Sequence, residues 1–125
     1  MSVQLIDFPR PFQVWLYAVG HGQLLLRSNR SDEFTTRVDM LLNNVAAMHL
    51  PTVFDDLSLA EASADEARGL NIQLGALPVG DRKVFLIRGS NFVGYIVAGA
   101  VAWHEDEGHD YDESHFQQSF LSVRV

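Results

Sequence analysis

Apolar and polar residues alternate in short runs along most of the chain, and turn-forming residues interrupt these runs every few positions. Phe12 to Val19 and Leu24 to Arg27 are two such runs, separated by Gly20-His21-Gly22. Arg82 to Arg88 and Phe92 to Trp103 are two more, separated by three residues that include Gly and Asn. Because Gly and Asn adopt the positive φ angles of a tight reversal at little cost, each pair is predicted to form a β-hairpin.

The run from Phe92 to Trp103 is apolar on both faces, which is typical of a strand covered on both sides in a sandwich or barrel. Gly94 and Gly99 within it indicate a bend or the close approach of another element. The run is also too short to cross a membrane as a helix, which takes about 20 residues.

Three further regions carry weaker patterns. Thr36 to Leu50 fits two strands around Asn43-Asn44 or a single helix that stops before Pro51, and the turn-rich surroundings favour strands. Leu57 to Ala60 and Leu70 to Leu74 alternate as half-exposed strands do. A short helix is predicted over 63–68, because Ser63 and Glu66 have capping-box spacing and Gly69 is a plausible C-cap. Towards the end of the chain, the spacing of Phe116 and Phe120 predicts another short helix, followed by an extended stretch from Leu121 to Val125.

Together these patterns predict eight or nine short strands and little helix. The expected fold is mainly β: a single domain over residues 1–125, built as an antiparallel β-sandwich or a flattened barrel. The alternative is an α+β fold, which follows if residues 36–50 form a helix.

Composition narrows the functions that remain. The chain has 125 residues and no cysteine, so disulfides and thiolate zinc sites are excluded. Its net charge of −7 argues against binding to nucleic acid, which needs a basic face. The first ten residues lack the basic start and apolar run of a signal peptide, and no membrane segment is predicted, so a cytoplasmic location is expected.

Most of the acidity lies in one segment, His104 to His115, with the sequence HEDEGHDYDESH. Six of its twelve residues are carboxylates, so the rest of the chain carries a net charge of only −1. A charge run of this kind is usually a solvated loop. An acidic loop can also dock on a basic protein surface, with Tyr111 as an aromatic anchor. The predicted contact acids are Glu105, Asp106, Glu107, Asp110, Asp112 and Glu113.

The same segment offers a metal-binding alternative through His104, His109 and His115 with a neighbouring carboxylate. Imidazole nitrogen and carboxylate oxygen together suit divalent metals such as Zn, Ni, Mn or Fe. The spacing fits poorly, however, because a helical zinc-protease motif needs two His four residues apart, and the first two here are five apart. The carboxylates do not follow the alternate spacing of a calcium loop either.

Two features of the first hairpin are also candidates. His21 lies between two glycines at its turn, where it can act as a contact residue or a general base, although exposed turn histidines are common. Trp15 and Tyr17 alternate with Val14 and Leu16, which predicts an aromatic face that either binds a sugar ring or a protein or forms part of the core. No nucleophile elbow, P-loop or dinucleotide fingerprint is present, so catalysis that depends on these motifs is not indicated.

The function that these observations favour is a non-catalytic protein-binding module, such as an intracellular inhibitor or immunity-type protein. Its acidic loop would engage a basic protein partner, without a cofactor. The alternative function is a metal-binding protein or metal-dependent hydrolase that uses residues 104–115 and a divalent metal. A homodimer formed through a sheet edge or the aromatic face is a third hypothesis.

Overall fold

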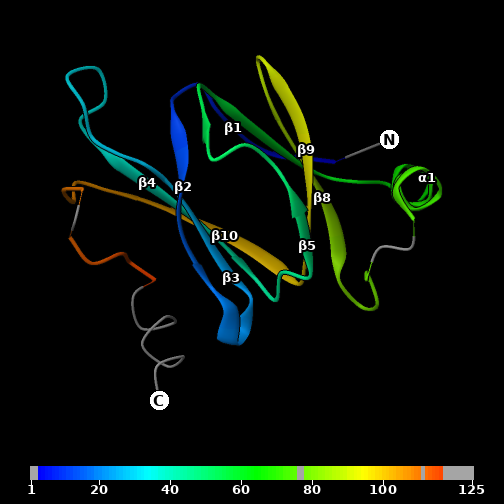
Figure 1. Ribbon diagram of the computed structural model, residues 1–125. Coiled ribbons are helices and arrows are strands. Elements are labelled where there is room, and N and C mark those ends of the chain that lie inside the picture. Colours follow the sequence, from blue (N-terminus) through cyan, green and yellow to red (C-terminus); the bar gives the residue numbers. More distant parts are fainter. Residues whose placement is uncertain (1–2, 76–77, 111, 117–125) are drawn as a thin grey trace.

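The computed structural model describes residues 3–75, 78–110 and 112–116, and it shows two five-stranded antiparallel sheets that face each other (Figure 1). The first sheet has the strand order β1-β7-β8-β9-β5, and the second has the order β10-β4-β3-β2-β6. The expected β-sandwich is therefore confirmed. The strands are β1 (Val3–Phe8), β2 (Phe12–Ala18), β3 (Gln23–Ser28), β4 (Arg37–Asn43), β5 (Ala47–His49), β6 (Val53–Phe54), β7 (Leu57–Glu61), β8 (Lys83–Gly89), β9 (Phe92–Ala98) and β10 (Ala100–Asp106).

The core lies between the sheets and is made by alternate residues of their strands. Leu24 and Leu26 of β3 and Met40 and Leu42 of β4 contribute from the second sheet, and all four are fully buried. The first sheet contributes, among others, Leu59, Phe85, Ile87 and Ile96. Burial of these side chains is the main stabilising term for such a domain.

Both predicted hairpins are present, as β2–β3 and β8–β9. The second differs from the prediction in one respect, because the run from Phe92 to Trp103 is divided at Gly99 into β9 and β10, which belong to different sheets. The N–H of Gly99 donates to the carbonyl of Asn43 at 2.8 Å, and a Cβ on Gly99 would lie 3.2 Å from the Cβ of Asn44. The glycine thus permits the close approach at which the chain crosses between sheets.

Residues 36–50 form two strands, β4 and β5, so the helical alternative for this region is wrong. The reversal between them begins at Asn44, which has a φ of 55°. Asn tolerates this left-handed conformation better than most residues. The Asn-Asn pair therefore marks a turn.

The helical turn predicted from Ser63 and Glu66 is longer than expected. Helix α1 spans Ala64–Leu74, and its capping box is present, with Ser63 Oγ accepting from the N–H of Glu66 and the Glu66 carboxylate accepting from the N–H of Ser63. The prediction of a strand from Leu70 to Leu74 is wrong, and Gly69 lies inside the helix. Leu70, Ile72 and Leu74 are spaced two positions apart, as residues on one face of a strand are, and this spacing explains the wrong prediction. None of the helix residues is buried.

Strand pairing also changes the interpretation of the first hairpin. The register of β2 on β3 shifts between Val14 and Leu16, so that Tyr17 pairs with Leu24 of the core. Trp15 instead packs against Leu25 and Leu41 on the outer face of the second sheet. A β-bulge accounts for this, because one extra residue turns the following side chains to the opposite face. The single aromatic face predicted from Trp15 and Tyr17 therefore does not form.

Strands β1 and β6 were not anticipated from the sequence. β1 pairs with β7 at an edge of the first sheet, and the two-residue β6 pairs with β2 at an edge of the second. The predicted elements at residues 117–125 lie outside the described residues. Within the described ranges, no helix has the length and apolar character needed to cross a membrane.

Candidate functional site

The acidic segment 104–115 begins in β10 and then folds over the outer face of the second sheet. Beneath it lie Arg27 of β3 and Arg37 and Asp39 of β4, which are 1–2% exposed. These residues alternate with core-facing Leu26 and Val38, so the same two strands place apolar side chains inward and charged side chains outward. This part of the outer face therefore carries buried charged side chains, beside the apolar Leu25 and Leu41.

The deepest contact is the ion pair between Arg27 and Asp39. Nε of Arg27 lies 2.7 Å from Oδ1 of Asp39, and Nη2 lies 3.1 Å from Oδ2. Arg27 also donates to the carbonyl of Asp110 at 2.7 Å, and the Ser114 hydroxyl donates to Oδ2 of Asp39 at 2.6 Å. The indole ring of Trp15 lies 4.7 Å from the Arg27 guanidinium carbon. The pair thus ties two points of the acidic segment to the sheet.

Arg37 also anchors the segment, and its guanidinium donates mainly to the segment's backbone carbonyls. Its guanidinium pairs with the carboxylate of Asp106 through two contacts of 3.1 Å. It also donates to the carbonyls of His109, Asp112 and Glu113 at 2.9 to 3.0 Å. One buried side chain therefore fixes four residues of the segment.

Gly108 is part of this anchor for a steric reason. A Cβ at this position would lie 2.5 Å from Nη2 of Arg37 and 2.6 Å from its Cζ, which is closer than a real contact. The Gly108 N–H donates to Oδ1 of Asp106 at 2.8 Å. The glycine between Glu107 and His109 in the sequence thus lets the backbone lie directly against the arginine.

The electrostatics of Asp106 follow from this arrangement. Partial burial raises the pKa of Asp106, but the hydrogen bonds from Arg37 and from the Gly108 N–H, together with the nearby guanidinium charge, outweigh it and hold the pKa below its ordinary value. Asp106 is therefore a structural carboxylate of the segment.

Two flanking arginines complete the support. Arg30 donates to the carbonyl of Glu107 at 2.8 Å. Arg10 donates to the carbonyl of Thr36 at 2.6 Å, and the Thr36 hydroxyl donates to the carboxylate of Glu105. Four arginines therefore support the segment, directly or through Thr36: Arg27 of β3, Arg37 of β4, Arg30 after β3, and Arg10 between β1 and β2.

The predicted contact acids divide into two groups in the structure. Asp106 pairs with Arg37, Glu105 accepts from Thr36, and the Asp112 carboxylate accepts from the N–H of His109. The carboxylates of Glu107, Asp110 and Glu113 are on exposed residues, and within the described residues they have no hydrogen bond or ion pair. Tyr111, the predicted aromatic anchor, lies outside the described residues.

The three histidines are placed differently from a metal centre. The rings of His104 and His115 stack with their centroids 3.8 Å apart and their planes 14° from parallel, so the in-plane lone pairs of the two rings do not converge on one ion. Nε2 of His109 lies 3.4 Å from Nη1 of Arg30, which is a cationic neighbour. In the described ranges, no group of three or more His, Asp or Glu is arranged to hold a metal ion.

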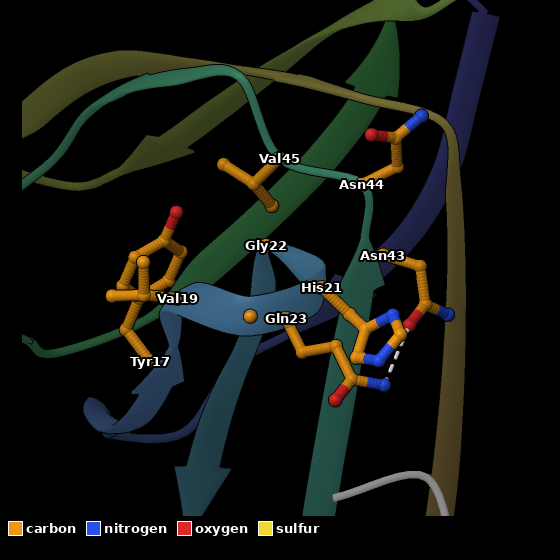
Figure 2. A pocket seen from close by; sticks show the side chains of 9 residues that line it. Tyr17, Val19, His21, Gly22, Gln23, Asn43, Asn44 and Val45 are labelled. Carbon is orange, nitrogen blue, oxygen red and sulfur yellow. Dashed lines mark hydrogen bonds between the residues drawn. The ribbon is translucent and has the colours of Figure 1, made fainter. Parts of the chain in front are cut away.

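His21 lies apart from the acidic segment, beside a hollow of about 670 Å³ at one end of the second sheet (Figure 2). The hollow is bordered by the short 3-10 helix η1 (Val19–His21) and by the turn that follows β4. Figure 2 shows Tyr17 and Asn43 on opposite sides with Gln23 between them, and Nε2 of Gln23 donates to Oδ1 of Asn43 at 3.2 Å.

No protein-family model, no curated protein and no solved structure matches this chain. Sequence reasoning found the acidic segment and His21 but missed the arginines beneath the segment and the carboxamides around the hollow. A signal for the arginines was present, because Arg27, Arg37 and Asp39 interrupt strongly apolar strands.

Proposed function

We propose that this chain is a non-catalytic protein-binding module whose acidic segment engages a basic surface of a partner protein. The observation that carries the proposal is the way the segment is held. Its buried arginines bind mainly backbone carbonyls, so Glu107, Asp110 and Glu113 keep their carboxylates exposed. A fixed backbone that presents free charges pays less ordering entropy on binding than a mobile loop does.

The charge distribution supports the same proposal. The segment carries six of the carboxylates on a chain of net charge −7, so a positive partner surface would be attracted to this face in particular. Such complementarity raises the association rate and disfavours acidic competitors. Masking a basic surface is one way in which an inhibitor or immunity-type protein acts.

The test neutralises the three exposed acids without touching the anchors. The site variant is Glu107→Gln, Asp110→Asn, Glu113→Gln. A matched control is Asp32→Asn, Asp55→Asn, Asp81→Asn, which makes the same change in charge at exposed positions elsewhere. Each immobilised protein is exposed to an extract of the source cells, and captured proteins are identified and purified for titration calorimetry at low and physiological salt.

The expected result is a basic protein that binds the parent and the control with similar affinity and binds the site variant at least about tenfold more weakly, a loss of about 1.4 kcal/mol. This difference should shrink as salt is added, since salt screens exposed charges. Loss of the captured protein's own activity in the complex would identify an inhibitor. If every captured protein binds the site variant as well as it binds the control, the proposal is wrong.

A further inference from the structure

The hollow beside His21 is built from two chain segments that lock together. Gly22, with a φ of 56°, accepts at its carbonyl from the N–H of Val45 at 2.8 Å, and a Cβ on Gly22 would lie 2.8 Å from the Val45 carbonyl oxygen. In addition, Arg82 donates to both the carbonyl and the side-chain oxygen of Asn44, at 3.0 and 3.1 Å. These contacts fix the two chain segments that line the hollow.

The lining is polar and neutral. It includes the carboxamides of Gln23, Asn43 and Asn44, the imidazole of His21 and the phenol ring of Tyr17, and no Lys, Arg, Asp or Glu lines it within the described residues. A carboxamide supplies two N–H donors and a carbonyl acceptor, so each of the three can offer both kinds of partner. Such a lining suits an uncharged ligand with many hydroxyl groups.

Gln23 adds an independent observation. The residue is 6% exposed, and Oε1 of its side chain has no hydrogen-bond partner in the described structure. An unpaired buried amide oxygen lowers the stability of the fold. The amide nitrogen of Gln23 is bonded to Asn43 at the hollow, so the unpaired oxygen is the part of this side chain that is unfavourable for the fold alone.

The amides of Asn43 and Asn44 also have unused hydrogen-bonding capacity. In each case the side-chain oxygen accepts a hydrogen bond, from Gln23 or from Arg82, and the structure gives the NH₂ group no partner among the described residues. Tyr17 is 37% exposed and offers a ring face or edge against which the apolar side of a sugar ring can pack. At about 670 Å³ the hollow lies within the size range of small-molecule sites.

From these observations we infer that the hollow is a binding site for a neutral saccharide, oriented by Gln23, Asn43 and Asn44 and packed against Tyr17. This inference does not depend on the proposed protein-binding function, because the two sites share no residue. Its chemistry also sets a selectivity: acidic sugars find no cation in the lining and are disfavoured by the net negative charge of the chain.

The experiment titrates isotope-labelled protein with maltose, cellobiose, lactose and N,N′-diacetylchitobiose and follows backbone amide resonances. Glucose 6-phosphate and galacturonic acid are the charged probes. Concentrations reach about 10 mM, which detects dissociation constants in the millimolar range. The site variant is Gln23→Met, which keeps the side-chain length, and the matched control is Gln13→Met, a glutamine of β2 away from the hollow.

The expected result is saturable shifts of the amide resonances of residues 19–23 and 43–45 with at least one neutral sugar. The affinity for this sugar should fall by at least about tenfold in Gln23→Met and remain unchanged in Gln13→Met. The midpoint temperature of thermal unfolding of Gln23→Met should be equal to or higher than that of the parent. This measurement separates loss of binding from loss of fold. The inference is overturned if no neutral sugar shifts these resonances, if the charged sugars bind as well, or if Gln23→Met binds normally. If Gln23→Met does not fold, Asn44→Gly takes its place, since glycine suits the positive φ. This variant removes the exposed amide and its hydrogen bond from Arg82, while the hydrogen bond from Arg82 to the carbonyl of residue 44 remains.

Discussion

The outer faces of the two sheets are covered in different ways. On the second sheet, the acidic segment is held by Arg27 and Arg37, which are almost completely buried and bind its backbone at four carbonyls. On the first sheet, Leu70 and Leu74 of helix α1 border a pocket together with Leu86 of β8 and Tyr95 of β9, and none of the helix residues is buried. Ile72 of the helix is 81% exposed and Leu74 is 53% exposed.

This difference shows two routes to local order. Helix α1 satisfies its own backbone and begins at a capping box, so it needs little from the sheet below. Beyond β10, the described residues of the acidic segment form no helix or strand, and arginines from elsewhere in the chain donate to several of their carbonyls. Its order therefore depends on a few buried charges, and each of these is costly to leave unpaired.

The largest effect should come from breaking the buried ion pair. Asp39→Ala leaves the Arg27 guanidinium buried without its carboxylate and removes the acceptor of the Ser114 hydroxyl. We expect the free energy of unfolding to fall by about 3–5 kcal/mol, the usual cost of an uncompensated buried charge. Urea denaturation measures this loss, with Asp32→Ala at an exposed site as the control.

The interpretation is checked by removing both partners together. Arg27→Met with Asp39→Leu leaves no unpaired charge, so this double variant should be more stable than Asp39→Ala alone. It should also release the backbone at Asp110, which amide hydrogen exchange would detect as faster exchange in the acidic segment. A loss below about 1 kcal/mol for Asp39→Ala would show that water or a rearranged segment replaces the carboxylate.

A smaller effect, of opposite sign in the two regions, is expected from glycine to alanine. Gly108→Ala places a methyl group against the Arg37 guanidinium, which several hydrogen bonds hold in place, and should cost about 1–3 kcal/mol. Gly69→Ala lies inside helix α1, where the new Cβ would meet nothing within 4 Å apart from its chain neighbours and the backbone of the helix itself, and should stabilise by about 0.5–1 kcal/mol.

Thermal and urea unfolding of these two variants give the comparison directly. Equal effects of Gly108→Ala and Gly69→Ala would mean that the segment moves aside from Arg37 as freely as a surface helix accepts a methyl group. The contrast between the two faces would then be wrong.

The sequence predicted the parts of this structure that depend on local signals. Both hairpins were found because glycine and asparagine mark their turns, and the start of α1 was found because Ser63 and Glu66 have capping-box spacing. The strand interpretation of residues 36–50 was correct for the same reason, since Asn44 adopts the left-handed conformation that a turn requires.

What failed depends on distant partners. Leu70, Ile72 and Leu74 alternate as a strand does, but whether they form one depends on a neighbouring strand that is not there, and the helix started by Ser63 continues through them. The β-bulge that separates Trp15 from Tyr17 is likewise set by the pairing of β2 with β3.

The candidate site shows the same division. A run of six carboxylates is evident in the sequence, but which of them remain exposed depends on contacts such as those from Arg37, 69 residues or more away along the chain. The hollow could not be predicted either, because Gln23 and Asn43 are brought together only by the pairing of β3 with β4.

The smallest effect concerns acid, and it compares Asp106 with the exposed acids of the same segment. Because Arg37 and Gly108 hold the folded pKa of Asp106 below its ordinary value of 3.8, its contribution to stability is present above about pH 3.8 and is lost as the pH falls through the folded pKa. The stability gap between the parent and Asp106→Asn should therefore be constant near neutral pH and close in acid. Glu113→Gln, which removes a carboxylate without a partner among the described residues, is the control for the loss of one negative charge from the segment. Urea unfolding of the three proteins from neutral pH to about pH 3 measures the stability gap of each variant from the parent. If the gap for Asp106→Asn closes near neutral pH, or does not close at all, Arg37 does not lower the pKa of Asp106.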